Sequence, residues 1–312
     1  MQIHQSIQEF PKIPYPVVTS GTFDGVHLGH QKILEKIQHM AAANQGESVL
    51  LTFWPHPKYV LTPQKKDFKL LTTFNEKAAI LESLGIDHLI KIPFTLEFSQ
   101  TSSQRFVQSI LIDIIGTREL VIGYDHRFGK NREGSFAYLK ANASLYGFKV
   151  TEIPRQDVDH IGVSSTKIRQ YILNHEIHLA NKLLGRPYSL TGKVVKGQQI
   201  GRNIGFPTAN IEIAEEYKLI PSNGAYAARV RLQNSWWNGM MNIGVRPTLG
   251  LKTKTIEVHV IDFEGDIYDQ EITVQLIKQI RPESKFDNLE ELRDRLQIDR
   301  EEALSILDKT NF

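Results

Sequence analysis

Residues 21–30 read Gly-Thr-Phe-Asp-Gly-Val-His-Leu-Gly-His and lie between an apolar run, Tyr15–Thr19, and an amphipathic pattern that starts near Ile33. This order predicts a strand, a tight glycine turn and a helix. A helix start offers unpaired N–H donors and the positive end of the helix dipole. His27 and His30 are three residues apart, so both rings can face one ligand there. The stretch therefore predicts a polyphosphate site in which imidazoles donate hydrogen bonds without a permanent charge.

The functional interpretation of this turn is transfer of a nucleotidyl group from a nucleoside triphosphate, without a protein nucleophile. A surface loop or an incidental metal contact stays open as the alternative, because two histidines in a glycine-rich turn also occur there. Structural zinc is disfavoured, since the chain has no cysteine and no His-Glu-x-x-His helix. Gly-x-Gly-x-x-Gly is absent, so a dinucleotide fingerprint is not supported.

Composition narrows the function classes. The 312 residues suffice for two domains, each with its own core. The net charge is +2 without a polybasic block, which disfavours sequence-independent nucleic-acid binding. The absence of cysteine removes disulfide frameworks and thiol chemistry. No basic segment followed by an apolar stretch opens the chain, and no apolar run could span a bilayer, so we expect a cytoplasmic protein without membrane partners.

The first half alternates apolar runs with helical patterns, which predicts a Rossmann-like α/β domain with a parallel sheet. Ligands of such sheets bind beyond the carboxyl ends of the strands, and the polar motifs of this half follow strand ends. The expected strands after the first are 48–53, 88–92, 119–122 and 149–153, and the expected helices after the first are 75–84, 102–115 and 138–146.

The pattern changes near Leu184-Gly185-Arg186-Pro187, which predicts domains at 1–185 and 186–312. Alternating and β-branched segments then predict a small antiparallel β-barrel. Two variants of the capping box, Asp287-x-x-Glu290 and Asp299-x-x-Glu302, predict two terminal helices packed on the barrel. The expected strands are 190–195, 225–232, 237–243, 256–263 and 272–280.

Residues 164–169, Ser-Ser-Thr-Lys-Ile-Arg, open another helical pattern. Three hydroxyls and two cations at a helix start suit a triphosphate and can offset charge on a leaving pyrophosphate. A plain N-cap is the alternative, because serine and threonine are preferred caps. His56, between two prolines, and Arg127, beyond a strand end, would converge on the same crevice if the sheet is wound as expected.

Four segments, 21–30, 53–57, 123–129 and 164–169, together resemble the FMN adenylyltransferase module of prokaryotic bifunctional riboflavin kinase/FAD synthetases, which is similar to the wider HxGH-type nucleotidyltransferases. The resemblance implies catalytic roles for His27, His30 and Arg169. It implies ATP contacts for Gly21, Phe23, Asp24, Gly29, Ser164, Ser165 and Thr166. It implies flavin contacts for His56, Asp125 and Arg127. Two positions depart from the family: His126 stands where an aromatic is common, and Trp54 where an acidic or polar residue is frequent.

The second half contains a candidate phosphate loop. Glycines at 197, 201 and 205 let backbone approach a phosphate chain closely. Thr208 and Asn210 project to the same side of an extended backbone, so a hydroxyl and an amide oxygen can share one Mg²⁺ ion. A barrel corner at Gly-Phe-Pro-Thr is the alternative interpretation.

The segment Ile256–Val260 offers a candidate general base. Its apolar residues alternate onto one face, which places Glu257 and His259 on the other. A carboxylate there can accept the proton of a substrate hydroxyl that attacks a terminal phosphate. A solvated strand residue is the alternative.

Residues 205–210, 242–248 and 257–263 are similar, in order, to the riboflavin kinase domain. The resemblance implies Glu257 as base for the ribityl 5′-hydroxyl, Thr208 and Asn210 as Mg²⁺ ligands, and Asn242 at the flavin. ATP contacts are implied for Gly197, Gly201, Gly205 and Thr208. Asp269 stands where a glycine is frequent.

The sequence thus predicts a two-domain enzyme that needs ATP with Mg²⁺. The C-terminal domain would convert riboflavin and ATP to FMN and ADP, and the N-terminal domain would convert FMN and ATP to FAD and diphosphate. A monofunctional enzyme with one decayed site remains an alternative, as does a flavin-sensing or RNA-binding module without turnover. The sequence is compatible with a monomer.

Overall fold

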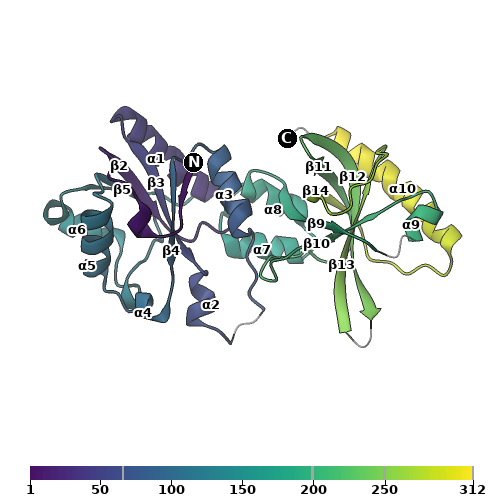
Figure 1. Cartoon of the computed structure of the whole chain (residues 1–312), viewed down its shortest axis with the longest axis horizontal. Helices are drawn as coiled ribbons and strands as arrows, with labels where there is room; N and C mark the ends of the chain where they lie inside the picture. The colour runs from purple at the N-terminus through teal and green to yellow at the C-terminus, as the bar shows by residue number, and fades with distance from the viewer. Residues whose placement is uncertain (65–66, 198–199, 249–250, 311–312) are drawn as a thin grey trace. The chain divides into compact units, whose positions relative to one another are not determined.

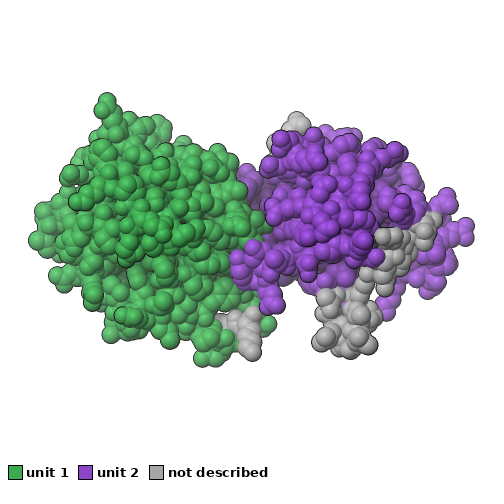
Figure 2. Space-filling model, viewed as in Figure 1, with its two compact units in different colours: residues 1–164 green, residues 165–312 purple. Residues whose placement is uncertain are grey.

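The computed structural model describes residues 1–64, 67–197, 200–248 and 251–310, without the side chains of residues 200, 203 and 246–253. The chain forms two compact units, Met1–Ser164 and Ser165–Phe312, which are coloured separately in Figure 2. Each unit has its own sheet and its own apolar core.

Unit 1 contains a six-stranded sheet in which every neighbouring pair is parallel (Figure 1). This confirms the predicted parallel sheet. Apart from β1 at the edge, chain order runs outward from β2 to one side and from β5 to the other, so the topological switch point lies between these two strands. The strands in spatial order are β1 (Gln2–His4), β4 (His88–Pro93), β3 (Glu47–Trp54), β2 (Pro16–Ser20), β5 (Glu119–Gly123) and β6 (Lys149–Ile153).

Helices cover both faces of this sheet. One apolar cluster joins the sheet to α1 (Leu28–Ala43) and α3 (Phe74–Ser83). A second cluster joins the opposite face to the π-helix η2 (Phe106–Ile114) and α6 (Phe136–Tyr146). The helix expected over 102–115 begins as a short α-helix, α5 (Ser103–Arg105), and continues as the π-helix η2. The smaller elements of unit 1 are η1 (Ile7–Glu9), α2 (Pro57–Leu61), α4 (Leu96–Ser99), η3 (Lys130–Arg132), β7 (Asp157–Val158) and β8 (Ile161–Gly162).

Unit 2 begins with α7 (Ser165–Leu173) and α8 (Ile177–Leu184) and continues into a closed six-stranded antiparallel barrel. The predicted barrel is confirmed. The strands in spatial order are β10 (Ala209–Glu212), β13 (Leu251–Val260), β12 (Ser235–Thr248), β11 (Gly224–Leu232), β14 (Glu271–Pro282) and β9 (Tyr188–Val195), and β9 pairs with β10 to close the ring. A one-turn helix, α9 (Ile200–Asn203), precedes β10.

The prediction of two C-terminal helices is wrong. One 20-residue helix, α10 (Leu289–Asp308), covers the barrel and buries Ala303 and Leu307 against it. Its N-cap is Asn288, whose side chain accepts the backbone N–H of Glu291. Asp299 does not begin a helix, because its carboxylate is buried inside α10 and pairs with Arg281 and Arg295.

Candidate active sites

The turn after β2 brings two imidazoles together. His27 is the N-cap of α1, and its Nδ1 accepts the backbone N–H of His30 at 3.3 Å. The two rings stack with centroids 3.7 Å apart and planes 11° apart. Both rings therefore lie at the positive end of the α1 dipole, where an anion is favoured.

The glycines of this turn make room for aromatic rings. A Cβ on Gly29 would lie 3.3 Å from the His27 ring, and one on Gly21 would lie 3.0 Å from the Phe23 ring. Phe23 in turn contacts His30, with ring centroids 4.7 Å apart. Two residues of this turn other than glycine adopt the left-handed region, Phe23 at φ 47° and Val26 at φ 39°. Such conformations persist only where surrounding contacts hold them.

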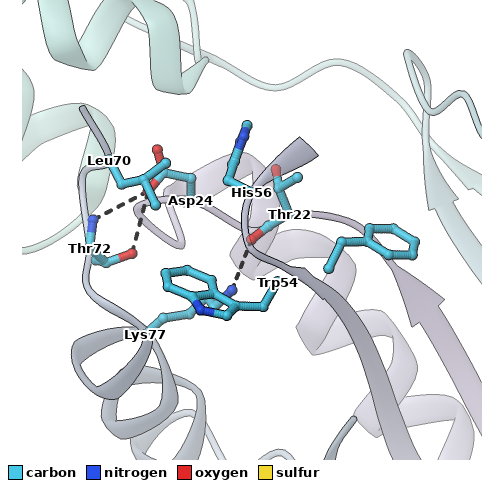
Figure 3. Close-up of a pocket in the computed structure, with 8 residues that line it drawn as sticks. Thr22, Asp24, Trp54, His56, Leu70, Thr72 and Lys77 are labelled. Atoms are coloured by element: carbon cyan, nitrogen blue, oxygen red, sulfur yellow. Dashed lines mark hydrogen bonds between the residues drawn. The ribbon is translucent and has the colours of Figure 1, made fainter. Parts of the chain in front are cut away.

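Asp24, a predicted ATP contact, is buried and bonded to the protein's own backbone. Its Oδ1 accepts the N–H group of Leu71 at 2.9 Å. It also accepts the N–H group of Thr72 at 3.2 Å (Figure 3). The Gly25 N–H donates to the Thr72 hydroxyl. The carboxylate thus joins the glycine turn to the segment that precedes α3. Asp24 therefore supports the turn that leads to the two imidazoles.

The carboxyl end of β5 meets the end of β2 at the switch point. Ser20 Oγ and His126 Nε2 lie 3.3 Å apart, which joins the two strand ends directly. Burial lowers the pKa of His126 to about 4, with a smaller contribution from the Arg132 cation, so the ring is neutral at neutral pH. The predicted flavin contacts Asp125 and Arg127 flank His126, and both are exposed.

A small pocket lies where β3 ends. Trp54, His56 and Asp24 line it together with Lys77 (Figure 3). His56 is also the N-cap of α2, since its Nδ1 accepts the Lys58 N–H at 3.1 Å. The remaining lining residues are Thr22, Phe53, Leu70 and Thr72.

Sequence reasoning missed Lys77. It lies on the face of α3 that also buries Ala78 and Leu81, and it is 3 % exposed. A charged residue among apolar residues at helical spacing is the signal that could have found it.

The predicted triphosphate contacts on residues 164–169 fall on both sides of the unit boundary. Ser164 is exposed and ends unit 1. Ser165, Thr166 and Arg169 lie on α7 in unit 2. Their part in the nucleotide site stays a prediction.

The barrel brings its candidate residues into one row. Asn210 on β10 is the register partner of Glu257 on β13, which is in turn the partner of Asn242 on β12. Directly opposite residues of neighbouring strands project to the same face. Thr208 Oγ1 lies 3.5 Å from Glu257 Oε2. Hydroxyl, carboxylate and two amides therefore lie beside one another.

The glycine loop packs onto this row. A Cβ on Gly197 would overlap the Asn210 amide, and one on Gly201 would overlap the Phe206 carbonyl oxygen and lie 3.5 Å from Thr208 Oγ1. Gly205 has φ 83°, a conformation that favours glycine. Residues 198–199 of the loop and the side chains 246–248 lie outside what the structure describes.

His259 supports the segment that carries Thr208. Its Nδ1 lies 2.8 Å from the Pro207 carbonyl oxygen, and its ring packs edge-on against Phe206. Burial lowers the pKa of His259, so the neutral ring donates to that carbonyl. The sequence did not predict a role for His259, because its partner is the backbone carbonyl of Pro207, which is distant in the sequence.

Comparison with known families gives each half a match. Residues 12–167 match the family model described as FAD synthetase, and residues 184–307 match the one described as riboflavin kinase. Fold, site and matches together define a two-domain enzyme of the flavin nucleotide transferase class.

Relatives of known name cover nearly the whole chain. Proteins named bifunctional riboflavin kinase/FMN adenylyltransferase are 38% identical in Buchnera aphidicola (96% of this chain, 97% of the relative), 37% in Listeria monocytogenes (94% and 93%) and 34% in Escherichia coli K12 (97% and 96%). The chain belongs to the family of bifunctional riboflavin kinase/FMN adenylyltransferases.

One solved structure, described as a macrolide-efflux protein from Streptococcus pneumoniae, is similar over 96% of this chain and 97% of its own, with a TM-score of 0.88 and 30% identity. This likeness supports the fold, whereas the family assignment rests on the two family models and the named relatives. Among the residues that the structure describes, no helix combines the length and the apolar character needed to cross a bilayer.

Proposed function

We propose that the two activities of the family divide between the two halves of this chain, with a functional boundary near residue 185. The barrel phosphorylates riboflavin with ATP to give FMN and ADP. The parallel-sheet domain transfers the adenylyl group of a second ATP to FMN, giving FAD and diphosphate. The order of the two family matches along the chain supports this division.

The observation that carries the kinase assignment is the row formed by Asn210, Glu257 and Asn242. Glu257 accepts the proton of the riboflavin 5′-hydroxyl as its oxygen attacks the γ-phosphorus of ATP. Asn242, on the neighbouring strand, contacts the flavin. The loop glycines 197, 201 and 205 bring backbone N–H groups to the phosphates.

Thr208 and Asn210 fit a hard cation, because a hydroxyl oxygen and an amide oxygen lie next to the Glu257 carboxylate. Mg²⁺ bound there together with ATP would neutralise charge on the phosphates. The residues of the loop keep Thr208 and Asn210 in place, since Gly197 and Gly201 pack directly against them.

In the adenylyltransferase site, the FMN phosphate attacks the α-phosphorus of ATP. A phosphate is already anionic at neutral pH, so this step needs no general base. His27 and His30 donate hydrogen bonds to the phosphates at the start of α1, and Ser164, Ser165, Thr166 and Arg169 assist the leaving diphosphate. Gly21, Phe23 and Gly29 shape the turn, Asp24 supports it, and His56, Asp125 and Arg127 receive the flavin.

Product chromatography tests the proposal. The purified full chain, given riboflavin, ATP and Mg²⁺, should release FMN first and FAD later. FMN as the only product would indicate a monofunctional kinase with a decayed N-terminal site. Flavin binding without ATP consumption would indicate a sensing or RNA-binding module instead. Omission of Mg²⁺, with chelator present, should stop both steps.

We also propose that the enzyme works in the cytoplasm as a monomer, without nucleic-acid or membrane partners. The small net charge and the lack of a polybasic block support this proposal. Cell fractionation and light scattering of the purified chain are the corresponding tests.

A further inference from the structure

Lys77 is a buried cation to which the reactions described above give no role. Its Nζ donates to the Thr52 hydroxyl at 2.8 Å. It also donates to the Thr22 carbonyl oxygen at 3.2 Å (Figure 3). The Trp54 and Phe74 rings lie 5.7 and 5.5 Å from the ammonium, within the range of cation–π attraction. The side chain therefore joins α3 to the end of β3 and to the turn after β2.

Burying this ammonium is costly. Desolvation lowers the pKa of Lys77 to about 8, against the attraction of the Asp24 carboxylate and with added repulsion from Lys91 on β4. An apolar side chain of similar volume would fill the space without this cost. The charged group therefore contributes through its hydrogen bonds and cation–π contacts, and not through the space that it fills.

These contacts hold a strained turn. Thr22 immediately precedes Phe23, the first of the two residues in the left-handed region. The Lys77 ammonium donates to the Thr22 carbonyl oxygen. The backbone N–H groups of Leu71 and Thr72 donate to the Asp24 carboxylate. Two anchors on either side of Phe23 fix the path of the chain toward His27.

We propose that Lys77 is a positioning residue for adenylyl transfer, which holds the turn 21–27 in the conformation that presents His27 and His30 to the nucleotide. The inference rests on the proposed role of these two imidazoles. The charged and titratable groups around the ammonium are Asp24 from the turn, Lys91 from β4 and His56 from the pocket wall.

The first test replaces Lys77 by methionine in the full-length chain. Loss of a charged donor should lower kcat/KM for ATP in FAD formation by about ten- to a hundredfold. Riboflavin phosphorylation by the barrel should stay unchanged and serves as an internal control. Lys36→Met, which removes an exposed lysine of α1, should leave both activities as they are.

The second test leaves Lys77 in place and removes one acceptor. Thr52→Val keeps the shape but deletes the hydroxyl, whereas Thr52→Ser keeps it. The charged ammonium holds the turn, so FAD formation should fall as pH rises through about 8. Thr52→Val disfavours the charged form and should shift this alkaline limb to lower pH, while Thr52→Ser should match the wild type.

The outcomes are separable. If Lys77→Met unfolds unit 1, the Thr52 pair still decides, because a merely structural hydroxyl would not move a pH limb. Coincident limbs for Thr52→Val and wild type, or an unchanged kcat/KM in a folded Lys77→Met enzyme, would overturn the inference. Unimpaired FAD formation by His30→Ala would instead overturn the proposed nucleotide site itself.

Discussion

The two candidate sites are built in different ways. The N-terminal site takes its imidazoles from one turn and one helix start, and contacts from Asp24 and Lys77 hold that turn in a strained conformation. The barrel site takes its groups from three neighbouring strands, and strand register alone aligns Glu257 with Asn210 and Asn242. Changes at residues that only support the turn, such as Lys77, should therefore impair the first site. The second site should be impaired mainly by changes at the residues that form it.

Glu257→Gln should have the largest effect, because it removes the proposed base while preserving shape. FMN formation from riboflavin should fall by about 10² to 10⁴-fold. Added FMN should still become FAD at the wild-type rate, since the barrel takes no part in that step. Separate rate measurements on riboflavin and on FMN check both statements, and equal loss of both rates in a folded protein would refute the division into two sites.

His30→Ala is the reciprocal change in the other site. FAD formation should fall by about 10² to 10³-fold because a donor to the developing phosphate charge is lost. FMN should accumulate from riboflavin. His39→Ala removes an exposed histidine from the same helix and is the matched control. Chromatography of the flavin products separates these outcomes.

The pH dependence of stability should distinguish the units through His126. Its folded-state pKa of about 4 lies below the unfolded value, so the unfolded chain binds more protons between about pH 6.5 and 4. Unit 1 should therefore lose on the order of 2 to 3 kcal/mol as pH falls through this window. His126→Phe should flatten that slope in urea unfolding curves, and an unchanged slope would contradict the assignment.

The glycine loop offers the smallest expected effect and the sharpest comparison within the barrel. Gly197→Ala should displace the Asn210 amide and raise KM for ATP in the kinase reaction by about tenfold. Gly205→Ala meets no atom within 4 Å, but its φ of 83° disfavours alanine, so we expect about a two- to fivefold rise. Initial rates at varied ATP concentrations test the order, and a larger effect at Gly205 would reverse the interpretation.

Local patterns predicted most of the fold. The strands β4, β5 and β6 agree with the predicted ranges to within one residue at each end, because apolar runs and flanking glycines mark them. The strands β1 and β10 were not predicted, since segments of three and four residues show too little periodicity and depend on their partner strands. The false helix start at Asp299 shows the reverse error: a capping pattern also fits a buried ion pair within a longer helix.

The site followed the same rule. The pair His27 and His30 could be predicted from their spacing along one segment, and the residues around Glu257 from their resemblance to the riboflavin kinase domain. Lys77 and His259 could not, because their partners are distant in the sequence and are often backbone atoms. Their roles become visible only when the chain is folded.

The strands β9 and β10, which close the barrel, also hold both ends of the glycine loop. Since β9 and β10 are hydrogen-bonded neighbours, the 13-residue connection between Val195 and Ala209 leaves and rejoins the ring at adjacent points. Both ends of the connection are thus fixed by the same ring of strands that sets Asn210 opposite Glu257, so the register of β10 and β13 does not depend on how long this connection is.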